Sequence, residues 1–540
     1  MKSHSHGGNS MRTFALAVAA LGLSPVWVGL TPSISRAAEP SVSAVPDAAA
    51  CANLARTDFG YIPDAPTNVN AAQLVAATGS TPAYCKVEGY VAPTVGIQVH
   101  LPTTNWNGKF LQYGCGGFCG SLNNAILCDT LNQRGYACVV TDMGHKSTGK
   151  DAKWAHNNLQ GEVDFGFRAT HVALLAGREI AKRYYQASPR YSYFMGCSTG
   201  GRQALVSAQR FPSDFDGIIG GAPPISHTGD GLALAWTVQS LSPRSRPLFT
   251  PAQLAMTNKA VVKACDLNDG SRDGLIGDPR QCKFDPGSLR CAEGGTGDCL
   301  NAAQVEAIRK VYVGPVDSRG RRIFTGGLER GSEYAWPDFL AGVDGSPSTY
   351  DSWMREEFRY MAFNPDPGPS WDLDSFDWDR DFKRLGMAEA LYDAPNPDLR
   401  RFKASGAKFI LYQGWLDRMV MPSQSVDYYE AVERVMGGPQ NTRDFMRLFM
   451  LPDVDHCIGG PGADLIDYLS ALEAWVERGE APDSLLAIKA KPDPDTPDWR
   501  RLFPIAADQI EFSRPVFPYP ARTVYRSGDP TKASSYRAAP

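Results

Sequence analysis

The feature that most constrains the fold is YSYFMGCSTGGRQ, residues 191–203. An apolar run ends at Met195, a Gly-x-Ser-x-Gly turn occupies residues 196–200, and GRQALVSAQRF then has the composition of a helix. Strand, sharp turn and helix in this order form a nucleophile elbow, because the glycines let the backbone turn tightly and raise the serine hydroxyl above a parallel sheet. The helix N-terminus behind the turn favours developing negative charge. Ser198 is therefore the predicted nucleophile, and an idle serine in a glycine-rich turn is the alternative.

Strand-like and helical segments alternate on both sides of this elbow. Apolar strands are expected within residues 135–145, 215–223, 408–417 and 445–457, the first ending in polar residues and the last running into a loop, with helices at 167–186 and 425–436. Alternation of this kind predicts an α/β fold with a parallel sheet covered by helices on both faces. The pattern stops near Pro224, and residues 225–396 are rich in Gly, Pro, Asp and Trp. We interpret that middle segment as an insertion into one α/β domain.

A serine nucleophile needs a base, and the base needs an acid that orients it. In hydrolases with this elbow the chain order is Ser, Asp, His. Two of the eight histidines, His227 and His456, follow Ser198, and His227 comes too early to leave room for an intervening acid strand. His456 follows the last strong strand and Asp417 follows the strand before it. We therefore predict a triad of Ser198, Asp417 and His456.

Three nearby polar residues carry weaker expectations. Asp453 and Asp455 are rival acids, but they share the loop of the histidine itself. His145 follows a strand end near the expected site and precedes the serine, so we interpret it as structural or as a support of the site.

An oxyanion hole requires backbone N–H donors aimed at the oxygen that acquires charge. Thr199, directly after the nucleophile, is expected to supply one donor. The second is expected from the glycine-rich loop at residues 114–118, with Gly117 preferred over Gly116. A plain glycine turn is the alternative for this loop.

The N-terminus has the pattern of an export signal. MRTFALAVAALGLSPVWVGL combines a charged start with an apolar run broken by Pro25, and small residues follow at Ala37 and Ala38. Residues 1–38 are predicted to be a cleaved bacterial secretory signal, with a retained anchor as the alternative. No later segment approaches eighteen uninterrupted apolar residues. The mature protein is expected to be periplasmic or extracellular.

Charge and cysteine content fit an exported protein. The net charge of −4 and the pI near 6.1 indicate neither a nucleic-acid partner nor an anionic membrane surface. Twelve cysteines, an even number, predict disulfides in an oxidising compartment. A zinc site at Cys115, Cys119 and Cys128 is disfavoured because no histidine lies at ligand spacing.

Cys197-Ser198, Asp417 and His456-Cys457 together resemble the CS–D–HC arrangement of the tannase/feruloyl esterase family. The resemblance covers most of the mature chain through WNGKFLQYGCGG, TDMGH, RFPSDFDGIIGGAP, CDLNDGSRDGLIGDPRQC, LYQGWLD and WVERGEAPD. It implies an α/β-hydrolase fold in which residues 39–224 and 397–540 form the catalytic domain and residues 225–396 form a large lid. It also implies hydrolysis of hydroxycinnamate or gallate esters, or of mono(2-hydroxyethyl) terephthalate in one branch.

The same resemblance implies a set of disulfides. The cysteines that flank the nucleophile and the base join in this family, so a Cys197–Cys457 bridge is expected. Relatives suggest three further bridges, which are Cys265–Cys282, Cys291–Cys299 and Cys51–Cys85. For the remaining Cys115, Cys119, Cys128 and Cys138 we expect Cys119–Cys128, although four cysteines allow three connectivities.

The resemblance further implies a structural calcium ion in the lid. The matching ligands are Asp266, Asp269 and Asp273 through carboxylates, and Ser271 and Leu275 through backbone carbonyls. Three carboxylates within eight residues suit a hard cation that prefers oxygen ligands. The loop is not an EF-hand, because the sixth and twelfth positions lack the required Gly and Glu. A solvated acidic loop is the alternative.

Three positions depart from the terephthalate branch of the family. Thr199 stands where that branch has an acidic residue, Val420 where it has an aromatic one, and Phe517 where it has a disulfide cysteine. The predicted activity is therefore hydrolysis of feruloyl-type aromatic esters through an acyl-enzyme. A tannase and a mono(2-hydroxyethyl) terephthalate hydrolase are the alternatives, and a non-catalytic polysaccharide-binding module is a remote one.

The expected partner is a small aromatic ester or a feruloylated polysaccharide fragment, with the protein a monomer that binds neither nucleic acid nor membrane. Aromatic and polar lid residues are candidates for contact with the phenolic ring, and packing in the lid core is the alternative for them. These candidates are Trp353, Phe358, Arg359, Trp371 and Trp378.

Overall fold

The computed structural model describes residues 48–540 except 293–294, 296–297, 344 and 494–503. The predicted secretory signal, residues 1–38, lies outside the described residues. None of the helices in the described part of the chain is long and apolar enough to cross a membrane.

A large mixed sheet organises the described residues, with its strands in the order β1-β2-β3-β5-β4-β6-β7-β8-β9. The strands β1, β2, β3 and β5 pair antiparallel, and the pairs from β5 through β4 to β9 are parallel. The expected strands at the elbow and at residues 135–145, 215–223, 408–417 and 445–457 are confirmed. The strands are β1 Thr67–Val75, β2 Tyr84–Val91, β3 Val95–Pro102, β4 Lys109–Tyr113, β5 Ala137–Thr141, β6 Tyr191–Cys197, β7 Gly217–Gly221, β8 Lys408–Gly414 and β9 Met446–Leu451.

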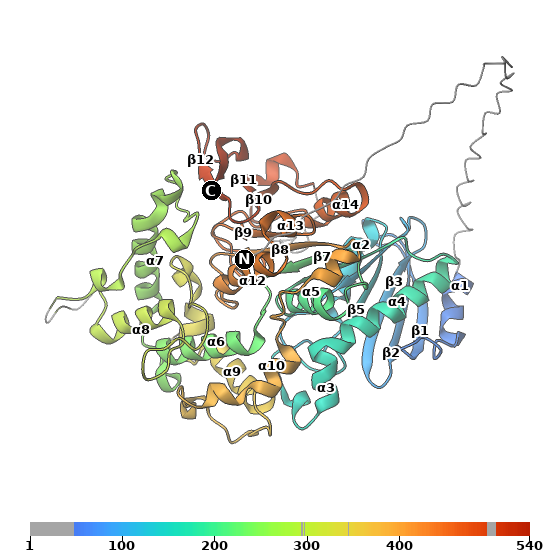
Figure 1. Cartoon of the computed structure of the whole chain (residues 1–540), viewed down its shortest axis with the longest axis horizontal. Helices are drawn as coiled ribbons and strands as arrows, with labels where there is room; N and C mark the ends of the chain where they lie inside the picture. Colours follow the sequence, from blue (N-terminus) through green and yellow to red (C-terminus); the bar gives the residue numbers. More distant parts are fainter. Residues whose placement is uncertain (1–47, 293–294, 296–297, 344, 494–503) are drawn as a thin grey trace, which may run out of the picture. The chain divides into compact units, whose positions relative to one another are not determined.

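Helices cover both faces of this sheet (Figure 1). The predicted helices at residues 167–186 and 425–436 correspond to α4 and α12. Two small two-stranded sheets lie near the C-terminus, formed by β10 Leu485–Ala490 with β11 Ile510–Val516 and by β12 Arg522–Tyr525 with β13 Tyr536–Ala539. The helices are α1 Ala48–Asn53, α2 Ile126–Gln133, α3 Leu159–Val163, α4 Ala169–Tyr185, α5 Thr199–Arg210, α6 His227–Leu241, α7 Pro251–Cys265, α8 Ala302–Val313, α9 Thr349–Tyr360, α10 Gly386–Tyr392, α11 Arg400–Ala404, α12 Pro422–Val435, α13 Pro439–Arg443 and α14 Tyr468–Arg478.

The central strands are apolar on both faces because each face is buried against helices. Phe110 packs into a core with α4, α5 and α12, whereas the next residue, Leu111, packs into a second core with α2 and α14. Ile218 and Ile219 divide between the two cores in the same way. This alternation explains why these strands appear in the sequence as short continuous apolar runs.

Between β7 and β8 the described chain contributes no strand to the large sheet. It forms α6 to α11 instead, and α8 and α9 pack against α6. Leu232, Val305, Trp336 and Phe358 belong to a separate hydrophobic core of this segment. The sequence pattern did not predict these helices, because α6 is apolar around much of its circumference and loops rich in Gly and Pro separate the others.

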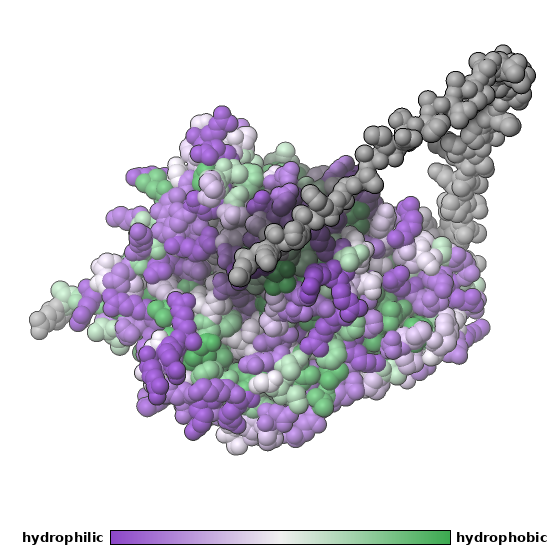
Figure 2. All heavy atoms as spheres, viewed as in Figure 1, coloured by the Kyte–Doolittle hydropathy of each residue, from purple (hydrophilic) through white to green (hydrophobic). Residues whose placement is uncertain are grey.

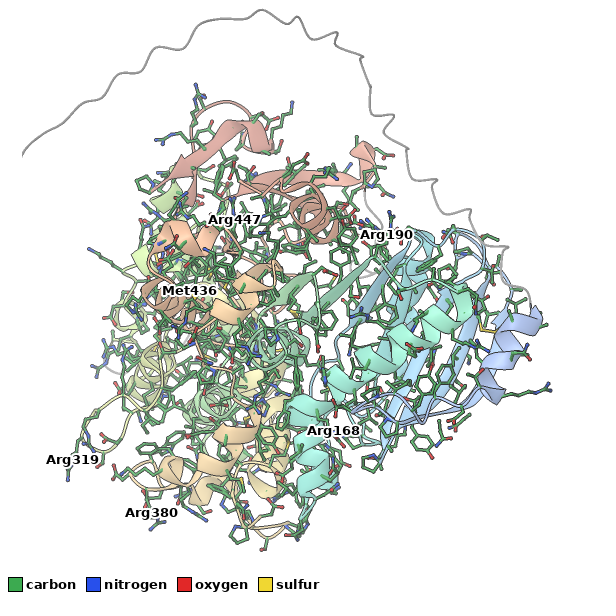
Figure 3. The ribbon with its side chains drawn as sticks, turned by 45° about the vertical axis from the view of Figure 1, so that its right-hand side comes forward. Arg168, Arg190, Arg319, Arg380, Met436 and Arg447 are labelled. Atoms are coloured by element: carbon green, nitrogen blue, oxygen red, sulfur yellow. A yellow bond between two sulfur atoms is a disulfide. The ribbon has the colours of Figure 1, made fainter. Side chains whose placement is uncertain are left out.

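Charged residues lie on the outside of this inserted segment. Arg319 and Arg380 point outward from its edge in Figure 3, and the Arg380 side chain is 70% exposed. Hydrophilic residues cover most of the face in Figure 2, with hydrophobic residues in small groups between them. The inserted segment therefore has its own apolar interior and a solvated exterior.

Within the described residues, six disulfides join the twelve cysteines. Four of them are the bridges that the resemblance implied, between residues 51 and 85, 197 and 457, 265 and 282, and 291 and 299. The expected Cys119–Cys128 bridge is wrong, because Cys119 pairs with Cys115 and Cys128 pairs with Cys138. Cys128 lies on α2 and Cys138 on the neighbouring strand β5, with their Cα atoms 5.6 Å apart, whereas Cys119 directly follows the glycine-rich loop.

Candidate active site

Ser198 occupies a strained turn between β6 and α5. Its backbone has φ 62° and ψ −126°, a left-handed conformation that costs a non-glycine residue roughly 1–3 kcal/mol. The Ser198 N–H donates to the Gly221 carbonyl at 3.0 Å, which fixes the turn against β7. A Cβ on Gly196 would lie 2.8 Å from the backbone of Gly200, so the turn requires glycine at that position. The surrounding backbone thus maintains the conformation expected of a nucleophile elbow.

His456 and Asp417 come together beside this turn. The Nδ1 atom of His456 lies 2.8 Å from Oδ2 of Asp417. The other ring nitrogen, Nε2, is buried and has no hydrogen-bond partner among the described residues. His456 and Ser198 line the same cavity, so the imidazole ring lies on the same side of the site as the serine.

The Asp417 carboxylate is fully buried at 0% exposure and has a complete set of donors. Its Oδ1 accepts the backbone N–H groups of Met419 at 2.8 Å and Val420 at 2.9 Å. Its Oδ2 accepts Gln413 Nε2 at 2.9 Å in addition to the histidine. These bonds fix the carboxylate and allow it to orient the imidazole ring.

The rival acids have other partners. Asp453 is buried and accepts the backbone N–H of Ile276, while Asp455 pairs with Arg418. In contrast to Asp417, neither forms a hydrogen bond to the ring of His456 in the described chain.

The glycine-rich loop reaches the nucleophile through Gly117. The Thr199 hydroxyl donates to the Gly117 carbonyl at 2.6 Å, and Gly117 adopts φ +58°. As the first residue of α5, Thr199 has a backbone N–H without an intrahelical acceptor. Gly117 and Thr199 line one cavity with Ser198, whereas Gly116 lines only the second cavity described below.

His145 supports this loop from behind. Its Nε2 lies 2.7 Å from the Phe118 carbonyl, and its ring stacks on Trp154 with the ring centroids 3.7 Å apart. Burial lowers the pKa of His145, which favours the neutral ring. A neutral imidazole donates through only one of its two nitrogens. The Phe118 carbonyl is the better acceptor for that hydrogen, because it is closer to the ring than the Met143 carbonyl at 3.3 Å. His145 therefore holds the backbone next to Gly117.

The Cys197–Cys457 bridge connects the turn of the serine to the loop of the histidine. The two Cα atoms lie 5.9 Å apart although 260 residues separate them in sequence. Each cysteine is the direct neighbour of a predicted triad residue, so the bridge limits how far Ser198 and His456 can move apart.

Two cavities meet at Ser198. One has a volume of about 60 Å³ and is bounded mainly by the inserted segment. The other has a volume of about 500 Å³ and is lined by the carboxyl ends of the strands and the loops after β9. Gly117 and Met419 also border both cavities. An ester carbonyl at the serine would thus have one space for its acyl group and another for its alcohol.

Two helices of the inserted segment form the ceiling of the smaller cavity. Helix α6 contributes residues 227, 230, 231 and 234, and helix α9 contributes residues 350, 353, 354 and 357. Both sets have the spacing i, i+3, i+4, i+7, which places their members on one face of a helix. Of these residues only Trp353 was expected from the sequence to contact a substrate, and this repeated spacing is the signal that indicates the others.

The lid residues expected to contact a substrate divide into two groups. Trp353 lines the smaller cavity and contacts Phe118 edge-on. Phe358 stacks on Trp371 in the core of the inserted segment, with the ring centroids 5.4 Å apart. Arg359 Nε donates to the Trp371 carbonyl, and Trp378 Nε1 donates to Gln239. The other four residues thus pack or form hydrogen bonds within the inserted segment, which agrees with the alternative that they belong to the lid core.

The expected calcium ligands form a compact acidic loop after α7. The Asp266, Asp269 and Asp273 carboxylates accept backbone N–H groups within the loop. Burial, with the nearby Asp273 and Asp266 charges, raises the pKa of Asp269 to about 6. Buried Asp453 approaches the loop, and its pKa is raised well above the usual range by burial and by the three loop carboxylates. Such an accumulation of oxygen donors and negative charge fits a hard cation.

Other contacts compete for the same carboxylates. Asp273 Oδ2 accepts Arg514 at 2.8 Å and the Tyr536 hydroxyl at 3.1 Å. In the ranges that the structure describes, no group of three or more histidine, cysteine or acidic side chains is placed to hold a metal ion. The donor types thus fit calcium, while their arrangement here is held by protein hydrogen bonds.

A serine elbow at the carboxyl ends of a parallel sheet, with an inserted helical segment above it, defines an α/β-hydrolase. The family model for tannase and feruloyl esterase matches residues 76–539. The chain belongs to the tannase and feruloyl esterase family, and it is a carboxylic ester hydrolase.

Individual relatives agree with this assignment. The chain is 32% identical to mono(2-hydroxyethyl) terephthalate hydrolase of Piscinibacter sakaiensis, covering 87% of each chain. It is 31% identical to an uncharacterized esterase of Xanthomonas campestris, covering 88% of each. The solved structure of feruloyl esterase B from Aspergillus oryzae is similar with a TM-score of 0.76 and 26% identity, covering 90% of this chain and all of that one.

Proposed function

We propose that this protein hydrolyses feruloyl-type aromatic esters through an acyl-enzyme on Ser198. The observation that carries this proposal is the smaller cavity beside Ser198. Its walls include Phe118, Tyr350 and Trp353, and no lysine or arginine is among its lining residues. An aromatic wall without a cation suits a neutral phenolic ring.

In the proposed mechanism His456 removes the proton from the Ser198 hydroxyl as the oxygen attacks the ester carbonyl. Asp417 holds the Nδ1–H of the ring and stabilises the imidazolium that forms. The Thr199 and Gly117 N–H groups stabilise the oxyanion. The alcohol departs with the proton from His456 into the larger cavity, and water then cleaves the acyl-enzyme by the same steps.

The alternative acyl groups differ in charge. Mono(2-hydroxyethyl) terephthalate carries a free carboxylate on its ring, whereas ferulate and gallate esters carry hydroxyl groups. A carboxylate in the smaller cavity would meet Glu357 and Asp230 and no lining cation. Burying a charge there without an opposite charge to balance it is unfavourable. The lining of the smaller cavity therefore favours phenolic esters over terephthalate monoesters.

Steady-state assays of the purified protein on methyl ferulate, methyl gallate and mono(2-hydroxyethyl) terephthalate test the proposal. We expect the highest kcat/KM on methyl ferulate and loss of turnover in Ser198→Ala. Turnover of methyl gallate alone would identify a tannase. Unchanged activity in Ser198→Ala would instead favour a binding module whose apparent hydrolysis has another origin.

The same proposal includes export and a structural calcium ion. Six disulfides fit an oxidising compartment, which supports a secreted or periplasmic location. N-terminal sequencing of the mature protein tests this, with cleavage near residue 38 expected. For calcium, the ligands would be the Asp266, Asp269 and Asp273 carboxylates with the Ser271 and Leu275 carbonyls, and the ion would neutralise their charges. Chelation should lower the Tm and added calcium should restore it, whereas an unchanged Tm would contradict a bound ion.

A further inference from the structure

We propose that Glu357, supported by His227, binds a hydroxyl group on the acyl ring and is the specificity-determining residue of the smaller cavity. The inference rests on the proposed function and assigns the part of the substrate that this cavity selects.

Glu357 is a buried carboxyl that the protein leaves without a hydrogen-bond donor. It lies on α9 one turn after Trp353, lines the smaller cavity and is 5% exposed. Within the described chain no hydrogen bond to its carboxyl is formed, and the ring of His227 faces it with Nε2 3.7 Å from Oε1. That nitrogen is itself buried and has no described partner. Two facing polar groups that both lack partners are unusual in a folded interior.

A second carboxyl in the same cavity shows the contrast. Both oxygens of Asp230 accept Gln424 Nε2 at 2.7 Å, and Oδ1 also accepts the Met421 N–H at 3.1 Å. The protein itself therefore satisfies Asp230. Glu357 has no equivalent partner, so its bonding capacity is available to a ligand.

The backbone makes room for the Glu357 carboxyl. A Cβ on Gly231 would lie 2.4 Å from Oε1 of Glu357, far inside contact distance. Gly231 faces Glu357 from α6, between the positions of Asp230 and Leu234 that also line the cavity. Only a residue without a side chain lets the carboxyl occupy this place.

Two further residues that line the cavity each carry a polar atom without a described partner. The Tyr350 hydroxyl and Trp353 Nε1 are buried and unpaired among the described residues. Each unpaired buried polar group costs about 1–3 kcal/mol, so a ligand that supplies a partner recovers part of that cost. A hydroxylated ring brings a donor and an acceptor into this apolar space, which an unsubstituted ring does not.

The charge states suit a phenol. Burial and the charge of Asp393 raise the pKa of Glu357 to about 8. Burial, with a contribution from Arg202, lowers the pKa of His227 to about 3. Near neutral pH the carboxyl is thus mostly protonated and the imidazole neutral. A protonated carboxyl both donates and accepts, so it can bond to a hydroxyl in either direction.

The test compares kcat/KM for methyl 4-hydroxycinnamate, methyl 4-methoxycinnamate and methyl cinnamate. We expect the wild-type protein to prefer the hydroxylated ester over the other two by about 10- to 100-fold. Glu357→Met, which keeps the size of the side chain but removes the carboxyl, should reduce this ratio to below about 3-fold. Glu357→Gln retains a donor and an acceptor and should keep most of the preference.

Glu356→Gln is the matched control, because Glu356 is the adjacent carboxyl on α9 and its Oε2 accepts the Ala152 N–H at 3.3 Å. It should keep the wild-type ratio. Thermal unfolding and hydrolysis of 4-nitrophenyl acetate, whose acyl group has no ring, report whether each variant is folded.

The outcomes separate the inference from the proposed function. A wild-type protein that cleaves 4-nitrophenyl acetate but none of the cinnamates would refute both. Equal kcat/KM on all three cinnamates, or an unchanged ratio in Glu357→Met, would refute only the role of Glu357. If Glu357→Met does not fold, equal kcat/KM of the wild-type protein on the 4-hydroxy and 4-methoxy esters would still refute the role of Glu357.

Discussion

Removal of the Cys197–Cys457 bridge by Cys197→Ala with Cys457→Ala should lower both stability and turnover. The bridge closes 260 residues, for which the chain-entropy relation gives about 5.5 kcal/mol. This figure is an upper value, because five other bridges already restrict the unfolded chain and such relations overestimate measured effects. We expect the free energy of unfolding to fall by about 2–5 kcal/mol, the range found when native disulfides are removed.

Turnover should fall for a geometric reason. Ser198 and Cys457 both have positive φ, 62° and 67°, so the backbone at each end of the bridge depends on its surroundings. A displacement of about 1 Å between reacting groups can cost roughly 100-fold in rate. The variant should therefore lose about 10- to 100-fold in kcat, while KM stays within about 3-fold because most residues that line the smaller cavity belong to the inserted segment.

Urea unfolding followed by circular dichroism, together with steady-state kinetics, measures the two effects. Cys291→Ala with Cys299→Ala is the matched control, because that bridge closes 8 residues within the inserted segment. The same relation gives about 2.5 kcal/mol for it, and kcat should be unchanged. Full kcat in a folded Cys197→Ala/Cys457→Ala protein would refute the idea that the bridge holds Ser198 and His456 in register.

Three further changes test other parts of the site. Asp417→Asn should lower kcat by about 10⁴-fold with little change in KM, because the imidazole loses the carboxylate that orients it; a loss below about 10-fold would exclude Asp417 as the acid. Gly231→Ala places a Cβ against the Glu357 carboxyl, so KM for methyl 4-hydroxycinnamate should rise about 10-fold and stability should fall by about 1–3 kcal/mol; an unchanged KM would contradict the close contact. The folded state raises the pKa of Glu357 from 4.5 to about 8, so the wild-type protein loses stability as pH rises through this range, because its unfolded state releases a proton that the folded state keeps. Glu357→Gln has no such proton and should therefore gain stability relative to the wild type between about pH 4.5 and 8. That difference reaches at most about 5 kcal/mol at 1.36 kcal/mol per pKa unit, and unfolding curves at several pH values that show a constant difference would disprove it.

Local sequence patterns were sufficient to predict those parts of the site that lie within a single segment of the chain. The strand, glycine turn and helix around Ser198 follow from neighbouring residues, because tight turns and amphipathic spacing are short-range properties. Asp417 and His456 were selected by their positions after strands, and strand ends meet at one edge of a parallel sheet. The structure adds the contact of 2.8 Å between them and the buried donors that fix the carboxylate.

Contacts between distant segments were harder to predict from the sequence. Cys115, Cys119, Cys128 and Cys138 allow three connectivities, and the expected one was wrong. The choice depends on which Cα atoms the fold brings within about 6 Å, as it does for Cys128 on α2 and Cys138 on β5. Spacing along the chain does not contain that information.

The sequence by itself determined the elbow and the alternating strands and helices, because each depends on residues close in the chain. It also contained Ser198, Asp417 and His456 in the chain order that hydrolases with this elbow share. The helical spacing of residues 227–234 and 350–357 was also present in it. Only the tertiary structure decided that these two helix faces lie over Ser198 and that Gly231 leaves room for Glu357. Those residues are more than a hundred positions apart, and packing of the whole inserted segment brings them together.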